Sequence, residues 1–348
     1  MHTIIMDMKD GPDETLICQA GEIIRSGGLV AFPTETVYGL GGDGLNALSS
    51  RKIYEAKGRP SDNPLIVHIA DFEALYPIVK EVTPMAKRLG EHFWPGPLTM
   101  ILPKSDLVPE QTTGGLDTVA VRMPSHPIAA ALIRAGGGYI AAPSANLSGR
   151  PSPTRASHVI EDMTGRIDAI IDGGDADIGL ESTIVDLSCG EPVVLRPGYI
   201  GLPGLREVIG DVMLDPGLLR EEDGVRPKAP GMKYRHYAPR APLTIVDGTE
   251  ENVTEWINAK VLELSGRGEK AGIICTEESK DAYRQGIIRC VGTRSDEATI
   301  ARHLYDVLRE FDALGVSQIW SEAFDTPKMG TAIMNRLIKA AGHHVVHV

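Results

Sequence analysis

The chain has 348 residues, with 35 Lys and Arg against 47 Asp and Glu, which gives a formal net charge of −12. This length favours two domains, and a content of 42% hydrophobic and 24% charged residues is typical of folded globular proteins. The acidic balance argues against a protein whose whole surface binds nucleic acid, because phosphate contacts require clustered Lys and Arg.

The four cysteines lie far apart and show no C-x-x-C spacing, so the sequence supports neither a disulfide framework nor a zinc ribbon. His343, His344 and His347 lack a nearby carboxylate or thiol, and a terminal strand explains them as well as a metal site does. No apolar stretch reaches the roughly 18 residues of a membrane span. We therefore expect a cytoplasmic protein with no membrane contact and no resident metal.

In the first 200 residues, short β-rich apolar runs alternate with segments of helical periodicity. The predicted strands are 28–32, 64–69, 98–102, 118–121, 139–142, 169–171, 182–187 and 192–195. The predicted helices are 49–56, 84–92, 127–135 and 155–163, each close to a Ser, Thr or Pro start signal. This pattern predicts one mixed α/β domain over residues 1–205.

Residues 206–241 contain Pro, Gly and charge runs that oppose regular structure, and they are predicted to be a linker. After it, predicted strands at 243–246, 272–275, 287–291 and 316–320 alternate with predicted helices at 253–264, 299–314 and 332–341. This alternation predicts a smaller, doubly wound, Rossmann-like domain with a mostly parallel sheet over residues 242–348.

Residues 39–44 formally match the G-x-G-x-x-G pattern of dinucleotide-binding folds. A helix would have to open at the last glycine, but the following residues delay it to about Ser49. The segment therefore favours a glycine-rich turn over a nicotinamide site.

Two polar loops are candidates for phosphate binding. Lys57 and Arg59 flank a glycine just before a predicted strand, and Ser144 and Asn146 follow another strand. Cations and backbone N–H groups in such loops suit phosphate. A solvated loop at 57–64, or a helix start at Ser144, explains the same residues.

Arg122 and Arg196 each end a predicted strand shortly before a proline, so both guanidiniums are expected at a rim of the sheet. Such arginines suit a carboxylate or phosphate, and a surface ion pair is the ordinary alternative. His68 lies within a strand on the same face as Ile66, where a packed core histidine is more common than a catalytic one.

The segment 226–240 carries five Lys and Arg residues and no acidic residue, inside the predicted linker. Tyr234 and Tyr237 interleave with these cations, a pattern typical of RNA-binding surfaces. The same charges suit a lid that closes over an anionic ligand. We favour the lid, because a linker between two domains can reach back to the first domain.

Five segments, in this order, resemble the YrdC-like family: 33–40 (PTETVYGL), 57–64 (KGRPSDNP), 143–149 (PSANLSG), 182–185 (STIV) and 195–198 (LRPG). The segment 229–239 (APGMKYRHYAP) and the domain after it resemble the longer, two-domain form of this family, the threonylcarbamoyl-AMP synthases. The resemblance implies a YrdC-like fold, a mixed, twisted open sheet with helices, followed by the Rossmann-like domain.

The resemblance implies an ATP-dependent nucleotidyltransferase. L-threonine and bicarbonate would give N-carboxythreonine, whose new carboxylate attacks the α-phosphate of ATP and yields L-threonylcarbamoyladenylate and pyrophosphate. A separate downstream transferase complex would then modify the tRNA adenosine next to the anticodon. ATP is the implied substrate, Mg²⁺ is expected to arrive with the triphosphate, and a weak direct contact with tRNA stays open.

The resemblance also implies which residues of this chain bind substrates, in one set for ATP and one set for threonine. The residues implied to bind ATP are Lys57, Arg59, Asn63, Thr118, Ser144, Asn146, Ser152, Arg196, Tyr234 and His236, and of these the resemblance implies catalytic roles for Lys57, Arg59, Ser144 and Asn146. The residues implied to bind threonine are Thr36, His68, Arg122, the backbone at Ala142 and Ser182. Arg122 suits the carboxylate through its bidentate fork, and His68 or Thr36 suits the hydroxyl.

The sequence is also compatible with two other classes of protein. A double-stranded RNA-binding module would use a basic surface without chemistry, and a carbamoyl transferase can contain a similar domain. The absence of C-x-x-C pairs counts against the carbamoyl transferase. Pyrophosphate release that requires both threonine and bicarbonate distinguishes the synthase from both.

Overall fold

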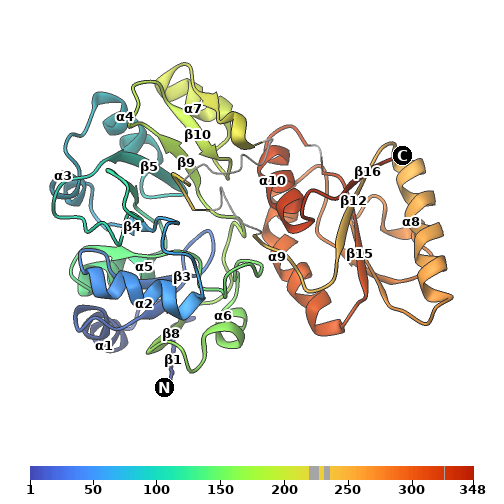
Figure 1. The fold of residues 1–348 in the computed structure, drawn as a ribbon, viewed down its shortest axis with the longest axis horizontal. Helices are drawn as coiled ribbons and strands as arrows, with labels where there is room; N and C mark the ends of the chain where they lie inside the picture. Colours follow the sequence, from blue (N-terminus) through green and yellow to red (C-terminus); the bar gives the residue numbers. More distant parts are fainter. Residues whose placement is uncertain (219–226, 231–235, 325) are drawn as a thin grey trace. The chain divides into compact units, whose positions relative to one another are not determined.

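Two separate β-sheets organise the chain (Figure 1). The structure is a computed structural model that describes residues 1–218, 227–230, 236–324 and 326–348. One unit comprises residues 1–148, 152–177 and the described part of 181–234. The other comprises residues 149–151, 178–180 and the described part of 235–348.

The first unit contains an eleven-stranded mixed sheet in the order β1-β8-β2-β3-β7-β4-β6-β5-β9-β10-β11. Its strands are β1 (Ile4–Asp7), β2 (Val30–Phe32), β3 (Gly39–Asp43), β4 (Ile66–His68), β5 (Leu98–Pro103), β6 (Thr118–Arg122), β7 (Ile140–Ala141), β8 (Ala169–Asp172), β9 (Thr183–Asp186), β10 (Val193–Arg196) and β11 (Met213–Leu214). Its helices are α1 (Glu14–Arg25), α2 (Ala47–Lys57), α3 (Leu75–Ile78), α4 (Pro84–Phe93), α5 (Pro127–Ala135), α6 (Ala156–Met163) and α7 (Leu202–Ile209). The predicted mixed open sheet with helices is confirmed.

Capping residues determine where α2 begins and ends. The side chain of Asn46 accepts a hydrogen bond from the backbone N–H of Leu48, an ordinary N-cap contact. The helix ends because Gly58 adopts a left-handed φ of 62°, which glycine tolerates without strain. Lys57 is therefore the last residue of a helix, whereas the sequence suggested that it lies in a loop.

Successive side chains along each strand point to opposite faces of the sheet. One face near β4 and β6 is apolar, and the other carries His68 and Arg122. Val67 of β4 packs in a large apolar cluster, whereas Ile66 packs on the other side with Ala120 of β6. Because side chains two residues apart share a face, His68 and Arg122 lie on the side of Ile66 and Ala120.

The predicted glycine-rich turn at residues 39–44 is wrong, because Gly39–Asp43 form β3, antiparallel to β2. A Cβ at Gly41 would lie 2.8 Å from Cγ2 of Ile140 and 2.9 Å from Cε1 of Phe32. The glycine therefore allows neighbouring side chains to pack against a strand.

The chain stays regular beyond residue 205, where we expected the linker to begin. Helix α7 continues to Ile209, and β11 pairs in parallel with β10. The short turns η1 (Phe72–Ala74) and η2 (Pro216–Leu218) complete the regular structure described in this unit.

The second unit contains a five-stranded sheet in the order β14-β13-β15-β12-β16, with every pair parallel. Its elements are β12 (Leu243–Asp247), α8 (Glu250–Ser265), β13 (Ala271–Cys275), η3 (Lys280–Ala282), β14 (Ile287–Cys290), α9 (Glu297–Leu314), β15 (Gln318–Glu322), α10 (Gly330–Ala340) and β16 (Val345–His347). Figure 1 shows α8 on one side of the strands and α9 and α10 on the other, so the predicted doubly wound, Rossmann-like arrangement is confirmed. None of the helices in the described ranges is both long and apolar enough to cross a membrane.

We expect Gly41→Ala to destabilise the first unit by about 1–3 kcal/mol, because the new methyl group would overpack the contact with Ile140 and Phe32. Denaturant unfolding of the full chain measures this loss. Gly204→Ala is the control, because its Cβ would come no closer than 3.9 Å to Phe93 and alanine favours the helix. An equal response of the two variants would contradict the packing argument.

Candidate functional site

A row of buried polar side chains crosses five strand positions of the first sheet. His68 on β4 is the register partner of Arg122 on β6, and Arg122 is in turn the partner of Thr99 on β5. Thr99 Oγ1 lies 2.7 Å from Ser182 Oγ, next to the first residue of β9. Arg196 at the end of β10 donates to Ser182 Oγ at 3.1 Å and to Ser182 O at 3.0 Å. The sheet thus brings together three threonine-set residues and Arg196 of the ATP set.

The loop at residues 33–38 lies against this row through Arg122. Nη1 of Arg122 donates to Thr36 Oγ1 at 2.8 Å, and Nη2 lies 2.8 Å from Glu35 Oε1. Both side chains of this ion pair are more than 90% buried. Among the described residues, Nε and Nη2 of Arg122 and both carboxylate oxygens of Glu35 have no hydrogen-bond partner. Buried polar atoms without partners are costly, so this cluster is suited to a polar ligand.

His68 is a neutral side chain inside the sheet. Burial, followed by the charge of Arg122, lowers the pKa of His68 to about 3. Its Nδ1 lies 3.1 Å from the carbonyl oxygen of Ile66, and its ring meets Phe32 edge-on with centroids 6.1 Å apart. Its proposed contact with the threonine hydroxyl stays a prediction.

A second cluster joins the end of α2 to the loop after β7. Lys57 Nζ donates to the backbone carbonyls of Ser144 and Asn146 and lies 3.4 Å from Asn146 Oδ1. Ser144 Oγ donates to the same amide oxygen at 2.5 Å. Lys57 is only 3% exposed, so its charge is held by these oxygens rather than by water. Three of the four residues implied to be catalytic therefore contact one another.

Arg59, the fourth of these residues, lies just beyond α2. Its Nη2 donates to the carbonyl oxygens of Asn63 at 3.2 Å and Pro64 at 3.0 Å. These contacts bring Arg59 close to Asn63, a second residue of the ATP set.

Backbone hydrogen bonds connect the two clusters through the loop at 33–38. Tyr38 O accepts from Ala145 N at 2.8 Å, and Tyr38 N donates to Pro153 O at 2.9 Å. Ser152, which precedes that proline, donates through Oγ to Glu181 Oε1 at 2.5 Å. The N–H of Ala142 is donated to Ile66 O at 2.9 Å, so the sheet already uses that donor.

Three predicted residues remain, and the structure describes two of them. Thr118 lies at the start of β6, and Arg122 lies at its end. Tyr234 lies outside the described residues. His236 belongs to the second unit, where its ring centroid is 5.5 Å from that of Tyr237.

The basic segment 226–240 is described only at residues 227–230 and 236–240. Within it, Lys228 Nζ lies 3.3 Å from Asp186 Oδ2, and Pro230 O accepts a hydrogen bond from Arg196 Nη1 at 3.3 Å. The lid and the RNA surface both stay predictions.

Sequence reasoning missed Glu35, Thr99 and Glu181. Glu35 is the acidic residue inside the segment 33–40, and its position between two threonines was the signal available for it. Thr99 becomes visible only through the pairing of β5 with β6 and its contact with Ser182. Glu181 precedes the segment 182–185 and accepts a hydrogen bond from Ser152 Oγ.

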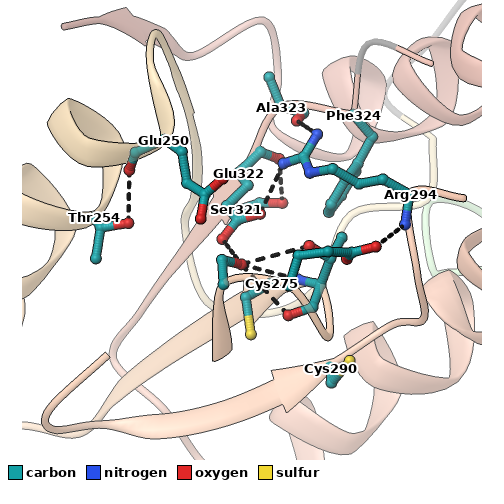
Figure 2. A network of polar contacts seen from close by, with 12 residues as sticks. Glu250, Thr254, Cys275, Cys290, Arg294, Ser321, Glu322, Ala323 and Phe324 are labelled. Carbon is teal, nitrogen blue, oxygen red and sulfur yellow. Dashed lines mark hydrogen bonds and ion pairs between the residues drawn. The ribbon is translucent and has the colours of Figure 1, made fainter. Parts of the chain in front are cut away.

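The second unit has its own polar network at the carboxyl ends of its parallel strands (Figure 2). Glu322 at the end of β15 accepts from Ser279, from the hydroxyl of Tyr283 at 2.7 Å and from Arg294 at 2.9 Å. Arg294 also donates to Ala323 O at 3.2 Å and lies over the ring of Phe324 in Figure 2. A cavity of about 300 Å³ adjoins it. The contacts within this network satisfy the buried carboxylate and stabilise the unit.

We expect His68 to make the first unit less stable in acid. The unfolded chain binds a proton on this ring near pH 6.5, whereas the folded chain does so only near pH 3, so stability is lost as the pH falls below 6.5. At pH 5 the loss is about 2 kcal/mol. Unfolding of the wild type and His68→Gln at pH 7 and pH 5 measures it, and the variant should show a smaller pH-dependent loss. Equal losses would show that His68 does not titrate on unfolding.

Two family models match the chain. One, described as telomere recombination and covering the Sua5, YciO and YrdC proteins, matches residues 22–198. The other, described as the C-terminal domain of threonylcarbamoyl-AMP synthase, matches residues 201–342. Together they span both units.

Curated relatives match the chain over nearly its full length. It is 47% identical over 346 residues to a threonylcarbamoyl-AMP synthase of Pyrococcus abyssi, covering 99% of this chain and 100% of that one. It is 49% identical over 331 residues to the Bacillus subtilis protein of the same name, covering 95% and 94%.

Solved structures agree with these sequence matches. The crystal structure of P. abyssi Sua5 complexed with L-threonine matches with a TM-score of 0.94 and 46% identity, covering 99% of this chain and 100% of that one. The crystal structure of E. coli YciO matches with a TM-score of 0.53 and 27% identity, covering 59% of this chain and 100% of that one.

Proposed function

The chain belongs to the threonylcarbamoyl-AMP synthase family, and from this membership we propose which of its residues carry the reaction. The enzyme is an ATP-using nucleotidyltransferase that forms L-threonylcarbamoyladenylate and pyrophosphate from L-threonine, bicarbonate and ATP. Its product serves the threonylcarbamoyl modification of tRNA.

The observation that carries the proposed threonine site is the incomplete hydrogen bonding of the Arg122 guanidinium, whose Nη2 is ion-paired with Glu35. Nη1 is bonded to Thr36, while Nε and Nη2 are buried without a hydrogen-bond partner in the described part of the chain. These two N–H groups form the fork that matches a carboxylate. We propose that the α-carboxylate of L-threonine binds this fork, with Thr36, His68, Ser182 and the backbone at Ala142 around the rest of the amino acid.

We propose that the cluster of Lys57, Ser144 and Asn146, together with Arg59, binds the phosphates of ATP. Two cations here can absorb the charge that develops when the α-phosphoryl group is transferred. Asn63, Thr118, Ser152 and Arg196 are the other members of the proposed ATP set that lie in the described part of the first unit. The backbone connection through Tyr38 supports a nucleotide close to the amino acid, because it ties both clusters to one loop.

The reaction needs no nucleophilic side chain. The carboxylate of N-carboxythreonine attacks the α-phosphorus, a new P–O bond forms, and the bond to pyrophosphate breaks. A carbamate forms and decomposes readily, so holding it beside the nucleotide supplies a large part of the catalysis. We propose that the labile adenylate then passes to a separate transferase complex in the cytoplasm.

Mg²⁺ is proposed to enter with the triphosphate. Among the described residues there is no group of three or more His, Cys, Asp or Glu side chains that could hold a metal ion. Phosphate oxygens and water would be its main ligands, as is usual for Mg²⁺ bound with a nucleotide.

We expect Arg122→Lys to raise KM for L-threonine by about 10- to 100-fold, because lysine keeps the charge and loses the fork, at a cost of about 1.5–3 kcal/mol. KM for ATP should change little. Steady-state pyrophosphate release measures both constants. Arg134→Lys, an exposed arginine paired with Asp71, is the control. An unchanged KM for threonine in Arg122→Lys would refute the carboxylate site.

Lys57→Met and Arg59→Gln should both reduce the use of ATP but should differ in stability. Lys57 is buried and binds two backbone carbonyls, so its loss should also destabilise the fold, whereas Arg59 is only half-buried. KM for ATP and denaturant unfolding separate these effects. Arg51→Met, on the exposed side of the same helix, is the control. Normal ATP kinetics in both variants would exclude the proposed phosphate cluster.

A further inference from the structure

Glu35 is a buried carboxylate whose own loop gives it no hydrogen bond. Its side chain is 8% exposed, and neither oxygen has a hydrogen-bond partner among the described residues. The nearby backbone N–H groups of Thr36 and Val37 are directed to Thr34 Oγ1 instead, at 3.2 and 3.3 Å. The loop itself therefore leaves the hydrogen-bond acceptor capacity of Glu35 unsatisfied.

Among the residues that the structure describes, Arg122 is the ion-pair partner of Glu35, and the pair is incomplete on both sides. Oε1 of Glu35 lies 2.8 Å from Nη2, yet the geometry of this approach forms no hydrogen bond. A buried ion pair repays the cost of desolvation only when further hydrogen bonds satisfy its remaining atoms. The ion pair therefore leaves hydrogen-bonding capacity unsatisfied on both partners, at Nε and Nη2 of Arg122 and at both carboxylate oxygens of Glu35.

This arrangement is complementary to the zwitterionic end of an α-amino acid. The carboxylate and the ammonium of such a molecule are attached to one carbon, so a group bound on Arg122 brings its nitrogen close to Glu35. A carboxylate alone on Arg122 would be repelled by Glu35, whereas an ammonium offers it three N–H donors.

We propose that Glu35 binds the α-ammonium of L-threonine and accepts one of its protons when the nitrogen is carboxylated. This inference rests on the proposed threonine site at Arg122. The α-nitrogen attacks the carbon of bicarbonate, an N–C bond forms, and a C–O bond breaks. Of the two protons that the ammonium loses, one leaves in the released water and the other goes to the Glu35 carboxylate. The products are N-carboxythreonine, water and protonated Glu35.

The other charged and titratable groups around Glu35 are less suited than its carboxylate to accept the proton from the α-nitrogen. Arg122 on β6 is a permanent cation. His126 caps α5 through Nδ1, which accepts from Ile128 N at 3.3 Å, and burial lowers the pKa of this ring against the opposing charges of Glu35 and Asp177. His68 beside Arg122 is neutral near pH 7, because burial, followed by the charge of Arg122, lowers its pKa to about 3.

Glu35→Gln tests the binding step, because it keeps the shape and removes the charge. Calorimetry on the full chain compares L-threonine with 2,3-dihydroxybutyrate, in which a hydroxyl replaces the ammonium. We expect the variant to bind threonine about 30-fold or more weakly than the wild type, while its affinity for the hydroxy acid is unchanged or improved. Glu91→Gln, on the exposed side of α4, should leave both affinities unchanged.

The two ligands separate this proposal from a structural role. If Glu35 only orients Arg122, the variant should lose affinity for both ligands by the same factor, which would overturn the proposal. If Arg122→Lys binds threonine normally, the proposed site itself fails, whatever Glu35→Gln does. Thermal unfolding of each variant establishes that it is folded under the conditions of the titration.

The pH dependence of pyrophosphate release tests the proton transfer. Below the pKa of the α-amine, the fraction of free amine rises about tenfold per pH unit. In Glu35→Gln, which lacks the proton acceptor, the rate of pyrophosphate release at saturating threonine should rise with pH as steeply as the fraction of free amine. In the wild type, the rate should rise less steeply with pH. Parallel profiles would overturn the role of Glu35 as proton acceptor.

Discussion

The buried guanidinium of Arg122 is the group on which the architecture of the site depends. A permanent cation inside a sheet is tolerated only if the surrounding fold supplies acceptors and opposite charge. The register of β4, β5 and β6 places His68 and Thr99 on either side of it, and the loop at 33–38 supplies Thr36 and Glu35. Burial keeps His68 neutral, and the charge of Arg122 adds to this effect by lowering the pKa of His68 further.

The ends of regular elements position Lys57, Arg122 and Arg196. Lys57 is fixed at the end of α2 by the left-handed glycine that follows it, and Arg196 is fixed at the end of β10. The connecting loops are in turn held by backbone hydrogen bonds, such as those of Tyr38 with Ala145 and Pro153. Ends of helices and strands are precise supports, which suits a reaction that depends on holding two reactants together.

The sequence predicted both sheets and most of the residues that contact one another in the site, because strand alternation and motif order are local signals. The prediction from sequence failed where contacts between residues distant in the chain determine the local structure. The glycines at 39–43 signal a turn, but the neighbours that require a glycine at position 41 come from Ile140 and Phe32. Elements β1 and α1 were not predicted, since charged residues interrupt the apolar runs of the first 24 residues and β1 is stabilised by pairing with the distant β8. Thr99 and Glu35 become candidates only after the strand register and the burial around Arg122 are known.

The resting site satisfies several of its charges with its own groups. Lys57 binds backbone carbonyls, Arg196 binds Ser182 and a backbone carbonyl, and Arg122 contacts Thr36 and Glu35. A substrate that binds here must replace these partners or complete them, so part of its binding free energy offsets contacts that already exist. A ligand that lacks one of the required polar groups leaves a buried charge without a partner, which is far more costly than losing an apolar contact. The arrangement therefore favours discrimination between substrates over tight binding, as a site that must commit ATP to one amino acid requires.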